Sequence, residues 1–256
     1  MYSIKDTGNR QETAKQMDLN ESILQVFNRL AYERKPVNLY NLYKSVPIIH
    51  EGIISRVDKQ GYINITTHKH QILCMNRDAD TTIISEYFPG YIKAKTKTID
   101  LNNKAALLGN FKYINEKLVQ RETVRVAPKE PVVVWFTIRE NNFRIKCELA
   151  DISIEGLAVR LPIDYFVPSR IRKNAEVLLN FQLPIPQQKN PVNVQARAII
   201  KNTMGDVGSL HKRIGMRTFF ERDANMCVMQ YIQQRVRDIT RELEFTYNAL
   251  IKLHQK

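Results

Sequence analysis

Two arginines close together in the chain are the residues best suited to bind a small anionic ligand. Arg121 and Arg125 lie in the polar stretch RETVR, just before an expected strand. Each guanidinium is a planar fork of donors that can hold phosphate oxygens, or the O6 and N7 atoms of guanine, through two parallel hydrogen bonds. The pair therefore suits a ligand that carries phosphate, guanine or both.

A second polar segment, DISIEG, follows where one expected strand ends and the next begins. Asp151 offers two acceptor oxygens that suit the N1–H and N2–H donors of guanine, and Ser153 offers a hydroxyl. Gly156 leaves a backbone that can turn sharply and be approached closely. Either segment alone is equally typical of a solvated surface or a capped turn, but together they predict a pocket for a guanine nucleotide.

The elements that position these residues are expected to form two domains. Residues 1–118 begin with a helical leader over 18–35, where Asp18 and Glu21 resemble a capping box, and continue as an all-β region. Short β-like runs with turns between them indicate a small barrel or sandwich. The expected strands of this domain cover residues 48–57, 62–67, 71–76, 83–88 and 91–99.

Residues 119–256 are expected to form a second barrel followed by a long helix over about 223–254. Its expected strands cover residues 132–138, 143–149, 157–161, 175–183, 192–201 and 214–220. The predicted fold class is therefore mainly β, with two small antiparallel β-barrel or split-barrel domains, an N-terminal helix and a long C-terminal helix.

Apolar residues of the C-terminal helix recur in heptads. One register is Met229, Val236, Leu243 and Leu250, and the other is Ile232, Ile239, Thr246 and Leu253. This pattern is typical of a coiled coil, which would make the chain a homo-oligomer. A helix that packs along its own barrel shows a similar stripe, so both interpretations stay open.

The composition indicates the chemical class of the partner but not its identity. The net charge is +13 and is spread along the chain, which favours an anionic partner such as a nucleotide, nucleic acid or membrane surface. No apolar run is long enough for a membrane span and no signal-peptide stretch is present, so we expect a cytoplasmic protein.

A basic nucleic-acid-binding β-barrel is the alternative function. Such a barrel would expose aromatic side chains along its strands, whereas the aromatic residues here mostly occupy alternating apolar positions. We therefore expect them in the core, and nucleic acid is not the first choice of partner. The aromatic residues in question are Trp135, Phe136, Phe143, Phe181, Phe219 and Phe220.

Neither a metal centre nor an enzyme is predicted. His68, His70 and Cys74 are close in sequence and could be read as metal ligands, but on a strand alternate residues share a face, so we expect only two of the three to converge. Solvent-facing histidines beside a turn are much commoner than metal ligands. The sequence has no Gly-rich phosphate loop, nucleophile elbow or zinc-protease helix. We expect a binding protein without a cofactor.

The order of the two polar segments, their separation by one β-hairpin and their position ahead of a barrel resemble the PilZ family of cyclic di-GMP receptors. The resemblance covers residues 119–222 and includes the segment IGMRTF over 214–219. It implies a six-stranded barrel that binds cyclic di-GMP. Arg121 and Arg125 would clamp the ligand, and Asp151, Ser153 and Gly156 would form the second wall.

Gln120 precedes the first arginine. In the family, that position influences whether one ligand or a stacked pair binds, and glutamine leaves the stoichiometry open. A β-rich domain followed by a PilZ-like domain also resembles the YcgR-type flagellar brakes. This implies that the ligand changes the domain arrangement and that the protein regulates motility or surface behaviour through a protein partner such as the flagellar motor, with recruitment to the basal body.

Overall fold

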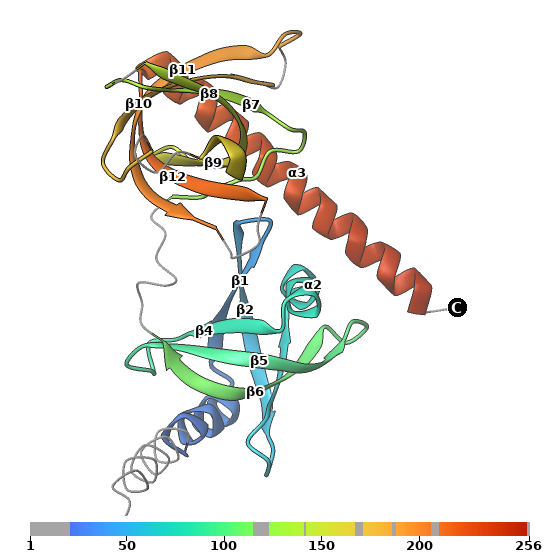
Figure 1. The fold of residues 1–256 in the computed structure, drawn as a ribbon. Helices are drawn as coiled ribbons and strands as arrows, with labels where there is room; N and C mark the ends of the chain where they lie inside the picture. Colours follow the sequence, from blue (N-terminus) through green and yellow to red (C-terminus); the bar gives the residue numbers. More distant parts are fainter. Residues whose placement is uncertain are drawn as a thin grey trace, which may run out of the picture. The chain divides into compact units, whose positions relative to one another are not determined.

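The structure is a computed structural model that describes residues 21–114, 123–140, 142–166, 171–185, 188–205 and 210–254. Over these residues it contains two closed antiparallel barrels of six strands each and a long C-terminal helix (Figure 1). The chain divides into two compact units, Met1–Tyr43 with Pro47–Arg121 and Glu242–Lys256, and Lys44–Val46 with Glu122–Arg241. The predicted fold class is confirmed, while the predicted boundary between residues 118 and 119 lies outside the described residues.

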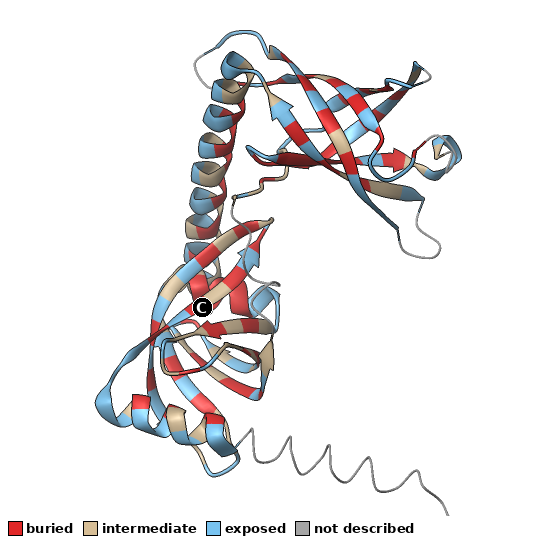
Figure 2. Cartoon of the chain, turned by 90° about the vertical axis from the view of Figure 1, so that its left-hand side faces the viewer, coloured by how far each residue is buried: buried red, intermediate tan, exposed pale blue. Residues whose placement is uncertain are grey.

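The first barrel has the strand order β1-β2-β3-β6-β5-β4 and is closed by the antiparallel pair of β1 and β4. Buried and exposed residues alternate along its strands because successive side chains point to opposite faces of a sheet (Figure 2). Its strands are β1 Pro36–Tyr43, β2 Val46–Val57, β3 Ile63–Thr67, β4 Asp80–Ile84, β5 Tyr91–Asp100 and β6 Ala105–Ile114.

The N-terminal helix packs on the first barrel through one apolar stripe. Residues 21–33 of it are described, and Ile23, Phe27 and Leu30 are fully buried. The ring of Phe27 lies 5.2 Å from that of Phe88 and 4.8 Å from that of Phe111, measured between centroids. The predicted helix is therefore present, although Asp18 of the predicted capping box lies outside the described residues.

One predicted strand of the first domain is wrong. Residues 71–76 belong to helix α2, Lys69–Arg77, in which Gln71 to Met75 are all buried. A short continuous apolar run fits a buried helix as well as a buried strand, and here the helical form prevails. The predicted run 83–88 is also displaced, because β4 ends at Ile84. Strands β1 and β6 were not among the predicted runs.

The second barrel has the strand order β10-β11-β12-β9-β8-β7 and is closed by the antiparallel pair of β10 and β7. All six predicted strands are present, extended by a few residues at several ends. The elements are β7 Val133–Ile138, β8 Phe143–Ile152, β9 Gly156–Pro162, a short 3-10 helix Ile163–Tyr165, β10 Glu176–Leu183, β11 Val192–Met204 and β12 His211–Phe220.

The C-terminal helix α3, Arg222–His254, buries a stripe that differs from the predicted heptads. Ile232, Ile239 and Leu243 are buried as predicted, but Met229 is 43% exposed and Leu253 is 70% exposed. The buried stripe also contains Val228, Tyr231, Arg235 and Tyr247. This spacing of three and four residues is typical of a helix that packs on its own chain. Self-association through α3 stays a prediction.

Polar contacts hold α3 within each unit. In the second unit, Nε of Arg235 donates a hydrogen bond of 3.2 Å to the carbonyl oxygen of Ala127. In the first unit, the hydroxyl of Tyr247 donates one of 2.7 Å to the carbonyl oxygen of Leu101. Among the described residues, no helix is both long and apolar enough to cross a membrane.

Candidate functional site

A β-bulge in β8 turns Asp151 into the protein. Burial along β8 alternates as far as Leu149 and is then continuous to Ile152, and the pairing of β8 with β9 shifts between Leu149 and Asp151. A bulge re-aims the side chains that follow it, which explains why a charged residue is buried here. Asp151 is only 3% exposed.

Backbone pairing brings Arg125 next to Asp151. Val126 and Ile152 form an isolated antiparallel bridge in which each amide nitrogen donates a hydrogen bond of 3.0 Å to the other carbonyl oxygen. As a result, Nη1 of Arg125 lies 3.9 Å from Oδ1 of Asp151, and about a third of the arginine side chain is exposed. Two of the predicted site residues from the two polar segments therefore lie side by side.

The carboxylate of Asp151 is also held by a second arginine, from β12. Nη2 of Arg213, on β12, donates a hydrogen bond to Oδ2 of Asp151. Oδ1 is buried and accepts no hydrogen bond from any described residue. Two arginines against one carboxylate leave local positive charge, and Oδ1 is an acceptor that a ligand donor could satisfy.

Ser153 and Gly156 shape the turn that follows Asp151. The amide nitrogen and the hydroxyl of Ser153 both donate to the carbonyl oxygen of Gly156, at 2.7 Å and 2.9 Å. A Cβ atom on Gly156 would lie 2.6 Å from the carbonyl oxygen of Met216, so only glycine fits this close approach of β9 to β12. These two residues thus close the hairpin between β8 and β9.

The remaining predicted residues, Gln120 and Arg121, lie outside the described residues. Arg213 was missed by the sequence analysis. It is one of 39 lysines and arginines in the chain, and no local pattern distinguishes it. Only the pairing of β12 with β9, which places Arg213 opposite Arg160, brings it to the aspartate.

A large hollow on the second barrel lies elsewhere. It has a volume of about 690 Å³ and includes neither Arg125 nor Asp151. Its walls include Trp135, with the guanidinium carbon of Arg144 4.4 Å from the indole ring centre, and Phe219. Trp135 is 39% exposed and Phe219 is 44% exposed, so the expectation that these two aromatic residues lie in the core is wrong, whereas Phe136 and Phe181 are buried as expected.

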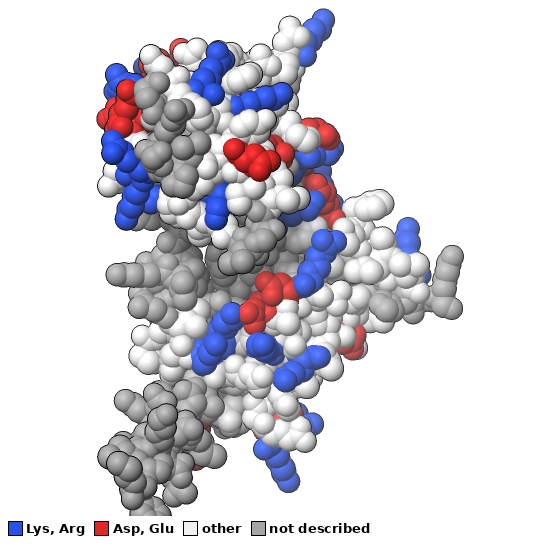
Figure 3. Space-filling view, viewed as in Figure 1, with Lys and Arg blue, Asp and Glu red and all other residues white. Residues whose placement is uncertain are grey.

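The positive charge is not gathered into one patch on the face shown in Figure 3. Lysine and arginine side chains are scattered over that face, with aspartate and glutamate side chains between them. Some of the described arginines also pair with acidic neighbours, such as Arg139 with Glu176 at 3.0 Å and Arg160 with Glu148 at 3.2 Å. On this face, therefore, the charge forms no broad positive field.

Three solved structures illustrate what the chain is similar to. The inhibitor of motility MotI/DgrA of Bacillus subtilis is 14% identical, with a TM-score of 0.40 over 80% of this chain and 97% of that one. The complex of MrkH with c-di-GMP from K. pneumonia is 14% identical, with a TM-score of 0.38 over 87% and 96%. YcgR of Escherichia coli in complex with c-di-GMP is 12% identical, with a TM-score of 0.38 over 90% and 95%.

No curated protein matches the chain at a significant level. The model of the PilZ domain matches residues 120–234. The matched range begins at Gln120, contains Arg121 and Arg125, and includes the turn from Asp151 to Gly156 with all six strands of the second barrel. Both polar segments and the barrel that joins them thus fall inside one match, that of residues 120–234 to the PilZ domain.

Proposed function

We propose that this chain is a receptor for cyclic di-GMP, which binds at Arg121, Arg125 and Asp151 of the second barrel. One observation carries the proposal: the match to the PilZ domain spans both polar segments, and Arg125 from the first lies 3.9 Å from Asp151 of the second. Cyclic di-GMP carries two phosphates and two guanines, the groups for which these side chains are suited.

Each residue has a distinct role in the proposal. Arg121 and Arg125 hold phosphate oxygens or the acceptor edge of guanine with bidentate hydrogen bonds. Oδ1 of Asp151 accepts from the N1–H and N2–H group of guanine, while Arg213 holds Oδ2. Ser153 and Gly156 act by closing the turn that presents the aspartate. Gln120 directly precedes Arg121 in the sequence. The number of ligands bound per chain is to be measured by titration.

Calorimetric titration of the full chain with cyclic di-GMP tests the proposal. Several charge-assisted hydrogen bonds, each worth about 1.5–3 kcal/mol, are expected to give micromolar or tighter binding, which corresponds to about −8 kcal/mol. Arg125→Ala and Arg121→Ala should each weaken binding by about tenfold or more, because each removes such bonds.

Arg139→Ala is the matched control for these arginines. Arg139 is an exposed arginine of the same barrel that pairs with Glu176 and lies outside both polar segments. Its loss should leave the affinity unchanged. Equal losses for Arg139→Ala and Arg125→Ala would mean that net charge alone attracts the ligand, and absence of any heat with the unchanged chain would contradict the proposal.

We further propose that binding changes the arrangement of the two domains. This change regulates a protein partner in motility, such as the flagellar motor at the basal body, and takes place in the cytoplasm. The arginines stand in the segment that joins the domains, so their engagement can bias that arrangement. Small-angle scattering of the full chain should differ with and without cyclic di-GMP. The Arg125→Ala variant should show no such difference, and superimposable profiles for the unchanged chain would contradict a rearrangement.

The hollow on the outer face of the second barrel favours a second candidate function, binding of single-stranded nucleic acid. Bases of a single strand could stack on the exposed rings of Trp135 and Phe219. Arg144 and Arg197, which also line the hollow, could neutralise its phosphates. Calorimetric titration with a single-stranded oligonucleotide distinguishes the two functions. Binding that weakens steeply with added salt, together with no response to cyclic di-GMP, would favour this alternative.

A further inference from the structure

We propose that the first barrel binds a divalent transition-metal ion, of which Zn²⁺ is the representative, through His50, His68 and His70. Candidate ligand atoms of these three imidazoles all lie within 4.8 Å of one another. Neutral imidazole nitrogen is a preferred ligand of zinc, and three histidines form the protein part of many zinc sites. This inference does not depend on the nucleotide site of the second barrel.

Three different positions in the fold bring the histidines together. His50 lies on β2, His68 is the residue that caps α2, and His70 is in the first turn of that helix. The ring centres of His50 and His68 are 4.1 Å apart, and those of His68 and His70 are 4.6 Å apart. The expectation that His68, His70 and Cys74 bind no metal assumed a strand at these residues. They cap or lie in helix α2 instead, and the third histidine of the cluster is His50, from β2.

Cys74 is not among the residues whose candidate ligand atoms converge here, and its side chain is buried. The donor set is therefore three nitrogens without sulfur, which suits Zn²⁺, Co²⁺, Ni²⁺ or Cu²⁺ better than Ca²⁺ or Mg²⁺.

Their surroundings favour the neutral forms of His50 and His68, in which one ring nitrogen carries a lone pair. Partial burial lowers the pKa of His50 and, with the neighbouring imidazoles and Lys69, lowers the pKa of His68 to about 4. Nδ1 of His68 accepts one hydrogen bond of 3.2 Å from the amide of His70. A metal bound at Nδ1 of His68 would replace this capping bond, because Nδ1 has a single lone pair.

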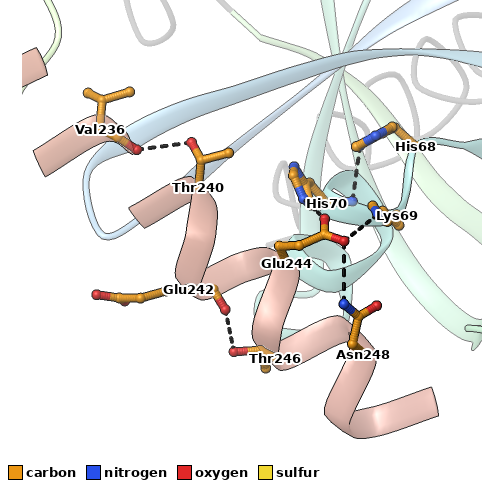
Figure 4. Close-up of polar contacts among 9 residues, drawn as sticks. All are labelled: His68, Lys69, His70, Val236, Thr240, Glu242, Glu244, Thr246 and Asn248. Carbon is orange, nitrogen blue, oxygen red and sulfur yellow. Dashed lines mark hydrogen bonds and ion pairs between the residues drawn. The ribbon is translucent and has the colours of Figure 1, made fainter. Parts of the chain in front are cut away.

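Glu244, near the end of α3, supplies the carboxylate that orients His70. Its Oε2 lies 2.9 Å from Nε2 of His70, while its Oε1 accepts from Nζ of Lys69 at 2.5 Å (Figure 4). A neutral His70 that donates from Nε2 keeps its lone pair on Nδ1. Such carboxylate–histidine pairs are the usual support of a histidine ligand, and Glu244 also balances the charge of Lys69.

Calorimetric titration of the chelator-treated full chain with Zn²⁺ tests the site, and the absorption spectrum of added Co²⁺ reports its geometry. We expect one ion per chain and a higher melting temperature with Zn²⁺. His50→Ala and His68→Asn should each weaken Zn²⁺ binding at least tenfold. Asparagine is a preferred helix N-cap, so His68→Asn removes the imidazole while it preserves the start of α2. Glu244→Gln should weaken binding by about 10- to 100-fold.

His211→Ala is the matched control, since it removes a histidine of the second barrel and should leave Zn²⁺ binding unchanged. Circular dichroism of each variant without metal establishes that the fold is retained. No Zn²⁺ binding by the unchanged chain would overturn the proposal. Equal affinities for the unchanged chain, His50→Ala and folded His68→Asn would overturn it as well.

Discussion

Phe27→Ala is expected to destabilise the first barrel by about 3–5 kcal/mol, the usual loss when a buried phenylalanine is truncated. Phe27 is fully buried and is the residue through which the N-terminal helix contacts the rings of Phe88 and Phe111. Truncation removes both ring contacts and leaves a cavity that the surrounding strands can fill only in part.

Native-state hydrogen exchange, followed by mass spectrometry, measures this loss locally. Because each 1.4 kcal/mol is a factor of ten, amides of residues 21–33 should exchange at least about a hundredfold faster in Phe27→Ala. Tyr32→Ala is the control on the same helix, because Tyr32 is 91% exposed and its loss should change stability by less than about 0.5 kcal/mol. Equal exchange in the two variants would show that the helix does not depend on this contact.

The second barrel could be predicted strand by strand because its sequence alternates cleanly. Residues 143–149 place Phe143, Ile145, Cys147 and Leu149 on one face, and β8 shows this alternation as far as the bulge. The bulge itself could not be predicted. It depends on how β8 pairs with β9, and the continuous burial from Leu149 to Ile152 does not follow from a period of two.

The first barrel was harder to predict because its strands depart from simple alternation. β6 pairs with β5 through two register shifts and contains Asn110 with a φ of 54°, so its apolar residues lose their period. β1 buries Asn41, which donates to the carbonyl oxygen of Asp80 at 2.8 Å. A buried amide in a strand looks like a surface residue until its partner is known.

Helix α2 was mistaken for a strand because its N-cap is a histidine. The preferred cap residues are serine, threonine, aspartate and asparagine, and none of them occupies the position directly before Lys69. Here Nδ1 of His68 takes that role. The same error hid the histidine cluster, since only a helix at Lys69 turns His70 towards Glu244 and leaves His68 beside His50.

The candidate site was predictable to the extent that its residues form short motifs. Arg125, Asp151, Ser153 and Gly156 were found from type and spacing, and the structure brings Arg125 and Asp151 together. Arg213 belongs to no motif and reaches Asp151 only through the register of β12. Long-range ion pairs of this kind depend on which strands pair and in which register, and the local sequence does not determine either.

Asp151→Ala is expected to weaken cyclic di-GMP binding by at least about a hundredfold. The change removes the acceptor of the N1–H and N2–H pair of guanine, and two charge-assisted hydrogen bonds at about 1.5–3 kcal/mol each account for such a loss. It also leaves the guanidinium groups of Arg125 and Arg213 without their common carboxylate. Calorimetry gives the affinity, and urea unfolding gives the accompanying change in stability.

Arg213→Ala separates a direct contact from a positioning effect. Both single variants break the same ion pair and should lose similar stability, but Arg213→Ala keeps the carboxylate and should weaken binding only about tenfold, the equivalent of one such bond. In the double variant the stability losses should not add, since the two residues are partners, while the affinity should stay close to that of Asp151→Ala. Equal affinity losses in the two single variants would instead assign Asp151 a purely structural role, with Arg121 and Arg125 left as the residues that recognise the ligand.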